Sequence, residues 1–138
     1  MKIIVDSDFL FGLVINVDAH HKNCKKILEK CSKDNIKLVA LNLVIQETAT
    51  VISGKRSQQD SLLFLDMISK MPIDIINLDT EIENLTWEIF KKQTKKGTSF
   101  IDCANLAFCQ KYKLDGILSF DDFYPKDKLA YPKEVIFS

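Results

Sequence analysis

The amino-acid sequence predicts a three-layer α/β/α domain, in which helices cover both faces of a mainly parallel sheet of about four to five strands. Three observations favour this fold class. Short apolar runs alternate with longer segments of helical periodicity, the chain has 138 residues, and no repeat, linker or low-complexity tract interrupts it. A chain of this length is the size of one domain, so we expect a single domain over residues 1–138.

The predicted strands are apolar runs that are too short to be helices. Unbroken apolar runs are typical of parallel strands that are covered on both faces. The runs lie at residues 2–5, 37–40, 73–78, 116–119 and 134–137.

Between these runs, apolar residues recur every three to four positions, which is the spacing of one helix face. The helical segments are residues 8–15, 19–33, 42–54, 57–71, 79–95 and 100–112. Side chains that cap helices precede most of them. The predicted caps are Asp18, Asn42, Ser57, either Asp79 or Thr80, and either Thr98 or Ser99.

The charge balance excludes a general electrostatic attraction to nucleic acid. The chain carries 19 basic and 19 acidic residues, so its formal net charge is zero. Any contact with a phosphate backbone must therefore come from a local group of basic side chains.

The composition is that of a soluble protein of a reducing compartment. None of the 4 cysteines forms a CxxC pair or has zinc-finger spacing, so we expect buried free thiols. The N-terminal apolar stretch is interrupted by Asp6 and Asp8, which argues against a signal peptide. No apolar run approaches the roughly 20 residues that span a membrane. We therefore expect a cytoplasmic protein without a membrane segment.

Acidic side chains occur at four places where they lie among apolar residues. Asp6 ends the first strand, Glu47 lies within a nearly uncharged helical segment, Asp102 is the only charge in TSFIDCANLAFC, and Asp121 and Asp122 follow ILSF. Any one of them has an ordinary explanation as a helix cap, an ion pair or a turn residue. The first and last follow the carboxyl ends of predicted strands, the edge at which parallel sheets bind ligands.

If these carboxylates converge, they need a positive partner. Two carboxylates about 4 Å apart repel by roughly 4 kcal/mol at an effective dielectric constant near 20. No lysine or arginine lies in the segments around Asp6, Glu47 and Asp102. Carboxylate oxygens suit Mg²⁺ or Mn²⁺, and the absence of nearby histidine or cysteine argues against zinc.

Three segments of the chain resemble a known family. IIVDSDFL, VIQETATVIS and FIDCANLAFCQKYKLDGILSFDDFY are similar, in that order, to the motifs of PIN-domain nucleases, and most of all to the VapC-type toxins of toxin–antitoxin pairs. Each motif is short, but together they extend over nearly the whole chain. The resemblance implies a PIN-like fold and a Mg²⁺- or Mn²⁺-dependent endoribonuclease that hydrolyses RNA with a metal-activated water.

The resemblance also implies roles for particular residues. It assigns catalysis and metal binding to Asp6, Glu47, Asp102 and Asp121. Ser7 and Ser119 match positions at which the family has hydroxyl groups, which would orient carboxylates or bound water. We interpret Asn105, three residues after Asp102, as a residue that lines the site. The family often has two residues between its last aspartate and an aromatic residue. Here Asp121, Asp122 and Phe123 are contiguous, so Asp122 is the alternative fourth ligand.

The implied partners are an RNA substrate, an antitoxin that is a separate chain, and a second copy of this chain in a homodimer. Phe9, Leu10, Phe11 and Leu13 make the first helical segment strongly apolar. Whatever part of this surface the core leaves free would suit the homodimer or a helix of the antitoxin.

Contacts with RNA are less evident from the sequence. Lys91, Lys92, Lys95 and Lys96 either contact phosphates at the edge of a groove or form a solvated helix end. We find no aromatic stacking platform in the sequence, and we interpret Trp87 as a core or packing residue.

Two other functions compete with the nuclease. VDSD and ILSFDD are similar to the acidic motifs of haloacid-dehalogenase-type phosphatases, but that interpretation leaves Glu47 and Asp102 unexplained, and Phe9 departs from that family's pattern. A non-catalytic PIN-like module that binds RNA or protein is the other alternative. The four filled acidic positions argue against it.

Overall fold

The computed structural model of the chain describes residues 1–130, so the predicted strand at 134–137 lies outside the described residues. A sheet of four strands forms the centre of the molecule, in the order β3-β2-β1-β4. All three strand pairs are parallel. The strands are β1 (Lys2–Val5), β2 (Lys37–Leu41), β3 (Ile73–Ile76) and β4 (Gly116–Leu118).

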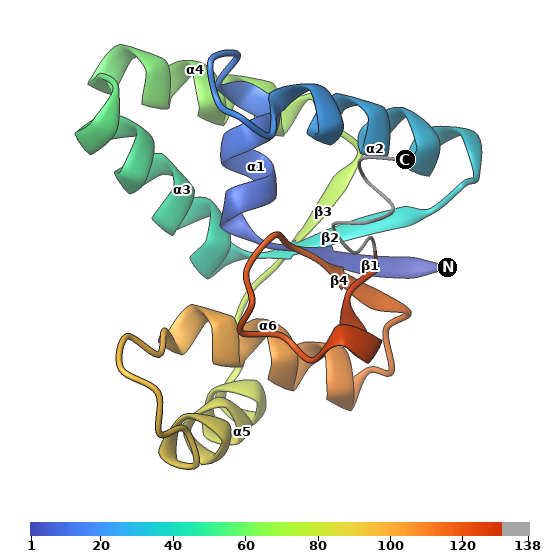
Figure 1. Cartoon of the computed structure of the whole chain (residues 1–138), viewed down its shortest axis with the longest axis vertical. Coiled ribbons are helices and arrows are strands. Elements are labelled where there is room, and N and C mark those ends of the chain that lie inside the picture. The colour runs from blue at the N-terminus through green and yellow to red at the C-terminus, as the bar shows by residue number, and fades with distance from the viewer. Residues whose placement is uncertain (131–138) are drawn as a thin grey trace.

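Helices cover both faces of this sheet, which confirms the predicted three-layer α/β/α architecture. Figure 1 shows α1 to α4 on one side of the sheet and α5 and α6 on the other. The helices are α1 (Ser7–Val14), α2 (His21–Lys33), α3 (Asn42–Lys55), α4 (Gln58–Ser69), α5 (Thr80–Lys91) and α6 (Phe100–Lys111), and a 3₁₀ turn, η1, follows at Lys126–Lys128.

The core lies between the sheet and these two helical layers. In β1, Ile3, Ile4 and Val5 are at most 2% exposed, as expected for a strand that is covered on both faces. The four free cysteines are also buried, as predicted. Because β1 pairs with β4 in parallel, the carboxyl ends of these two strands lie side by side. This register brings Asp6 next to Ser119.

Local capping explains where most helices begin. Ser57 Oγ accepts the Asp60 N–H of α4 at 3.0 Å, Asp79 Oδ1 accepts the Ile82 N–H of α5 at 2.8 Å, and Ser99 Oγ accepts the Ile101 N–H of α6 at 3.1 Å. In each case a side-chain oxygen accepts a hydrogen bond from a backbone N–H that has no partner inside its helix. These three caps were among those predicted.

Two predicted caps are wrong because longer-range or turn contacts occupy the side chains. Asp18 accepts the His20 N–H at 3.0 Å, and His20 precedes α2 without a side-chain cap. Asn42 is the first residue of α3, and its Oδ1 accepts the Leu78 N–H at 3.0 Å, which ties the segment after β3 to this helix.

Helix α5 ends at Lys91, four residues before the predicted end at Lys95. The Gln93 side chain donates to the Ile89 carbonyl oxygen at 3.0 Å, and the Gln93 N–H donates to the Phe90 carbonyl oxygen at 3.1 Å. These contacts satisfy carbonyl groups at the helix end, so the chain leaves the helix there.

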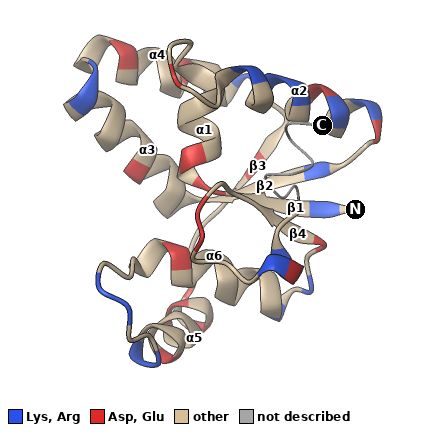
Figure 2. Ribbon diagram, viewed as in Figure 1, with Lys and Arg blue, Asp and Glu red and all other residues tan. Residues whose placement is uncertain are grey.

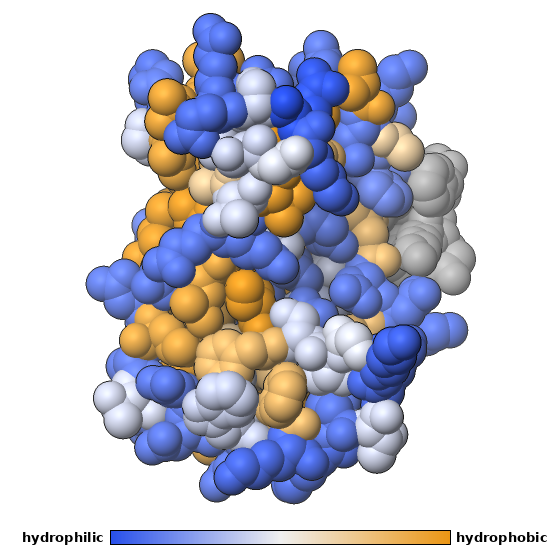
Figure 3. Space-filling model, turned by 90° about the vertical axis from the view of Figure 1, so that its left-hand side faces the viewer, coloured by the Kyte–Doolittle hydropathy of each residue, from blue (hydrophilic) through white to orange (hydrophobic). Residues whose placement is uncertain are grey.

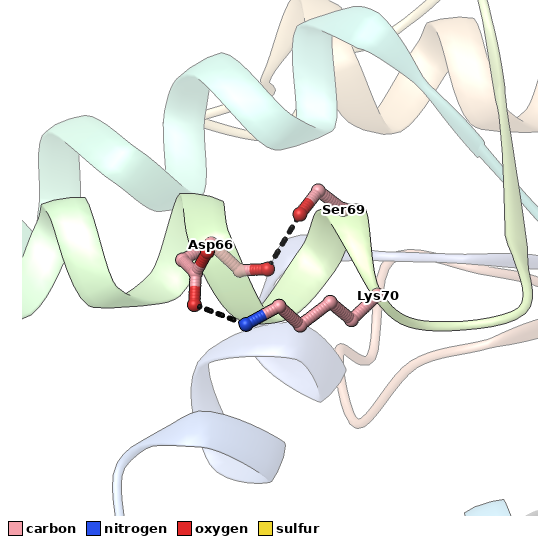
Figure 4. Close-up of polar contacts among 3 residues, drawn as sticks. All are labelled: Asp66, Ser69 and Lys70. Atoms are coloured by element: carbon pink, nitrogen blue, oxygen red, sulfur yellow. Dashed lines mark hydrogen bonds and ion pairs between the residues drawn. The ribbon is translucent and has the colours of Figure 1, made fainter.

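Helix α4 packs through Phe64 and Ile68 and exposes four large apolar side chains, Leu62, Leu63, Leu65 and Met67. At its C-terminal end, Ser69 Oγ donates to the Asp66 carbonyl oxygen at 2.6 Å, and Lys70 Nζ contacts the Asp66 carboxylate at 3.0 Å (Figure 4). Such an exposed ion pair adds little stability.

Within residues 1–130, no helix combines the length and the apolar character that crossing a bilayer requires.

Candidate active site

Asp6 lies at the centre of a polar cluster at the carboxyl ends of β1 and β4. Its backbone N–H donates to the Leu118 carbonyl oxygen at 3.0 Å, which fixes the end of β1 against the end of β4. The residue also caps α1, so a single position joins the strand, the helix and the site.

The Asp6 carboxylate is 3% exposed and accepts four hydrogen bonds. Oδ1 accepts from Ser7 N at 2.8 Å and from Asn105 Nδ2 at 3.2 Å. Oδ2 accepts from Ser119 Oγ at 3.1 Å and from the Tyr124 hydroxyl at 2.9 Å. Burial raises the pKa of Asp6, the negative charge of Glu47 adds to that rise, and the hydrogen bonds oppose it.

Asp102 lies in the first turn of α6 and faces the same cluster. The Tyr124 hydroxyl is 3.3 Å from Asp102 Oδ1 and 2.9 Å from Asp6 Oδ2. Burial and then the negative charges of Asp6, Asp121 and Glu47 raise the pKa of Asp102 to about 7. Asp102 is therefore within electrostatic reach of the other three acidic residues of the sequence hypothesis.

Ser119 connects the end of β4 to this cluster. Its Oγ lies 3.1 Å from Asp6 Oδ2 and accepts the Asp121 N–H at 3.0 Å. Asp121 is exposed, and its Oδ1 accepts the Phe123 N–H at 2.9 Å. Asp122 is exposed as well. The negative charge of Asp121 is one of those that raise the pKa of Asp102.

Comparison with known families identifies the family of the domain that carries this cluster. The PIN domain profile matches residues 3–126, which is most of the chain. The chain belongs to the PIN domain family. This assignment agrees with the resemblance found in the sequence and not with the phosphatase alternative. A comparison with curated proteins gave no match.

Solved structures of a toxin and of toxin–antitoxin complexes share the fold of this chain. The VapC20 toxin of Mycobacterium tuberculosis, described as cleaving the sarcin–ricin loop, has a TM-score of 0.75 at 19% identity, over 88% of this chain and 91% of that one. VapBC2 of Rickettsia felis, bound to a fragment of its promoter DNA, has a TM-score of 0.65 at 14% identity, over 88% and 89%. A toxin–antitoxin complex of Klebsiella pneumoniae has a TM-score of 0.62 at 15% identity, over 93% and 95%.

Tyr124 is a residue of this PIN domain that the sequence analysis missed. It is 3% exposed, and its hydroxyl lies between the carboxylates of Asp6 and Asp102 and accepts from Asn105 Nδ2 at 3.1 Å. A phenol has one proton to donate, so the two carboxylates share it. The predicted site-lining position of Asn105 is consistent with these contacts. Nothing in the DDFYP segment indicates that the tyrosine turns back into the site.

Asp8 also belongs to the cluster, in addition to the acidic residues of the sequence hypothesis. It lies in the first turn of α1, and its Oδ2 also accepts from the Phe120 N–H at 2.8 Å and lies 3.1 Å from Ser119 Oγ. Burial and the charge of Asp6 raise the pKa of Asp8 to about 7. Its Oδ1 is buried and has no hydrogen-bond partner in the described part of the chain.

A pocket of about 260 Å³ adjoins the cluster between α1 and α3. Ser7, Asp8 and Phe11 of α1 line it together with Thr48 and Lys55 of α3. The Ser7 side chain is thus placed beside the acidic cluster, while its backbone N–H is the group that contacts Asp6.

The donor set suits a hard divalent cation that keeps part of its water shell. In residues 1–130, no three histidine, cysteine or acidic side chains are close enough together to ligate one ion directly. Magnesium usually binds through one or two carboxylates and retains several waters. The ion pairs found in this range involve other carboxylates, so none of the clustered carboxylates is paired directly with a lysine or arginine there.

Proposed function

We propose that this PIN domain is a Mg²⁺- or Mn²⁺-dependent endoribonuclease, and that it is the toxin of a VapBC-type toxin–antitoxin pair. One observation carries the proposal: at the carboxyl edge of the sheet, the negative charges of Asp6, Asp121 and Glu47 all act on Asp102. Within residues 1–130, none of these four carboxylates forms an ion pair. The family assignment supports nuclease chemistry, and the solved VapC structures support the toxin role.

In this proposal one or two of the four carboxylates would ligate the cation directly, and the others would contact waters that it retains. A bound divalent ion lowers the pKa of a water and offsets the charge of the scissile phosphate. The residues around the site keep its ligands in position. Asp6 is held by four donors, and Tyr124 fixes the separation between Asp6 and Asp102. Such fixed side chains lose little entropy when an ion and a substrate bind.

The test is cleavage of RNA by the purified protein. We expect cleavage with Mg²⁺ or Mn²⁺, none with a chelator, and a loss of at least about a hundredfold for Asp6→Asn. Asp66→Asn is the matched control, because Asp66 is an exposed aspartate on α4 that contacts Lys70. Cleavage that persists in chelator or in Asp6→Asn contradicts the proposed site. Binding of RNA without cleavage under any metal favours the non-catalytic alternative.

The toxin role implies an antitoxin, and the structures of VapBC2 and of the Klebsiella pneumoniae toxin–antitoxin complex support such a partner. The expected surface on α1 is largely buried, since Phe9, Leu10 and Leu13 are at most 5% exposed. Exposed apolar side chains lie on α4 instead, where Leu63 and Met67 line a pocket of about 230 Å³ next to the end of α1.

We propose that this α4 surface receives an apolar helix of the antitoxin. Co-expression with a candidate antitoxin tests it, with Leu63→Glu expected to lose the complex and Asp66→Asn to retain it. A complex that forms equally well with Leu63→Glu places the antitoxin elsewhere. The homodimer remains a prediction of the resemblance, and light scattering of the isolated chain measures it.

A further inference from the structure

Helix α5 presents the only tryptophan of the chain to solvent. Trp87 is 42% exposed. Its ring packs edge-on against Phe90, with centroids 5.5 Å apart, and at a tilt against Phe100, with centroids 4.4 Å apart. Trp87 is therefore a packing residue, as the sequence analysis interpreted it, but it also exposes much of its ring to solvent. The two neighbours hold the ring in place while much of its surface stays free.

This aromatic cluster and the acidic site are both built in part on the first turn of α6. Phe100 begins α6, and Asp102 follows in the same turn. At a rise of 1.5 Å per residue, the two backbone positions are about 3 Å apart along the helix axis, although their side chains leave the helix in different directions. Figure 3 shows apolar side chains gathered across the middle of the face that looks out between α3 and the α5–α6 layer.

Four lysines follow the cluster directly. Lys91, Lys92, Lys95 and Lys96 are exposed, the segment KKQTKK contains no acidic residue, and within residues 1–130 none of the four takes part in an ion pair. Figure 2 shows this basic loop on the same side of the molecule as α3 and the start of α6, which carry acidic residues of the site. It is a local basic group of the kind that a chain of zero net charge needs in order to hold a phosphate backbone.

These observations favour a nucleic-acid strand over a second copy of the chain as the occupant. An isologous contact places the same patch of each copy in the interface. Such a contact centred on Trp87 would bring the two lysine segments close together, where they repel. A single-stranded RNA offers bases to stack on the aromatic rings and phosphates to meet the lysines.

We propose that Trp87, Phe90 and Phe100, together with Lys91, Lys92, Lys95 and Lys96, form a surface that binds single-stranded RNA next to the acidic site. We name it the aromatic–lysine surface. The inference deepens the proposed nuclease function and rests on it for the identity of the ligand. Trp87 stacks on a base, and the lysines contact the phosphates on its flank.

The experiment measures RNA binding in chelator, so that cleavage cannot contribute. The probe is a fluorescein-labelled single-stranded RNA of about 12 nucleotides, a length within the usual site size of such surfaces. We expect this RNA to quench the emission of Trp87 in the wild type. Fluorescence anisotropy should show binding weakened about tenfold in Trp87→Ala and largely restored in Trp87→Phe, because any aromatic ring stacks on a base.

The lysines have a matched control on the other side of the sheet. Replacing Lys91, Lys92, Lys95 and Lys96 by glutamine should reduce the slope of log affinity against log salt by about 0.7 for each phosphate that the lysines neutralise in the wild type. The same change at the exposed α2 residues Lys22, Lys25, Lys26 and Lys33 should leave the slope almost unchanged. Circular dichroism and light scattering of every variant report folding and oligomeric state.

The outcomes separate this inference from the nuclease proposal. Equal RNA affinity in the wild type, Trp87→Ala and the quadruple lysine variant overturns the inference, even if the protein cleaves RNA. A change of oligomeric state in Trp87→Ala with unchanged RNA affinity overturns it too, and makes the surface a protein interface. Binding that depends on Trp87, in a protein whose RNA cleavage persists without metal, supports the aromatic–lysine surface and contradicts the metal-dependent mechanism proposed above.

Discussion

At the scale of single residues, the site is organised by a shared proton. Tyr124 lies between two carboxylates that burial and mutual repulsion make harder to ionise. Its hydroxyl lowers the pKa of both, while burial and the neighbouring carboxylates raise the pKa of Tyr124 itself. The tyrosine therefore holds the acidic cluster together and remains protonated.

Removing this hydroxyl tests its structural part. We expect Tyr124→Phe to lower the free energy of unfolding by about 1 kcal/mol, because Asp6 loses one donor and Asn105 Nδ2 loses one acceptor. Tyr112→Phe is the control, since Tyr112 is 49% exposed. Urea denaturation measures both. Equal stabilities for the two variants would show that the Tyr124 contacts contribute nothing.

At the scale of elements, the cap of α6 matters more to the site than the caps of other helices. Ser99 satisfies the amides of Ile101 and Asp102, so it fixes the helical turn that carries the acidic residue. Ser57 does the same for α4, whose first turn carries no residue of the site. The two serines are thus equivalent in local structure and differ only in what their helices position.

This difference gives a paired prediction. Ser57→Ala and Ser99→Ala should each lower the free energy of unfolding by about 1 kcal/mol, the usual cost of losing a helix cap. Only Ser99→Ala should also reduce RNA cleavage, because the first turn of α6 carries Asp102. Thermal unfolding and a cleavage assay below both melting temperatures measure the two effects. Equal activities at matched stability contradict the link between the cap and the site.

At the scale of the whole molecule, a parallel sheet concentrates negative charge at one edge. All four strands point the same way, so the residues that follow β1 and β4 meet there. The pKa of Asp8 and that of Asp102 rise to about 7 from their ordinary value of 3.8, chiefly through burial. Folding therefore favours the protonated form of both groups.

The metal-free protein should lose stability as the pH rises. The stability gained from protonation is fully present below the unfolded pKa of 3.8 and is lost as the pH rises through about 7. We expect the melting temperature in chelator to fall across this window, and Mg²⁺ to raise it more at about pH 8 than at about pH 5.

Asp102→Asn is the control for this pH dependence. It should flatten the fall in melting temperature and weaken the effect of Mg²⁺, since it removes one of the charges. A melting temperature that rises with pH in chelator would contradict the burial and mutual repulsion of these carboxylates.

The sequence was sufficient wherever the interactions are local. The apolar runs predicted the four described strands, and oxygen side chains next to helix starts predicted the caps Ser57, Asp79 and Ser99. Asn42 shows the limit, because its oxygen contacts Leu78, 36 positions away, and leaves its own helix without a side-chain cap. A pattern within one segment carries no information about such a partner.

The sequence by itself determined the succession of strands and helices along the chain, and it placed acidic residues at strand ends and within apolar helix segments. Only the tertiary structure decided that Tyr124 and Asp8 join this cluster and that Trp87 is partly exposed, because their partners are distant in the chain or belong to another helix. The reason is physical: periodicity and capping depend on near neighbours, whereas burial and charge repulsion depend on everything that folding brings close.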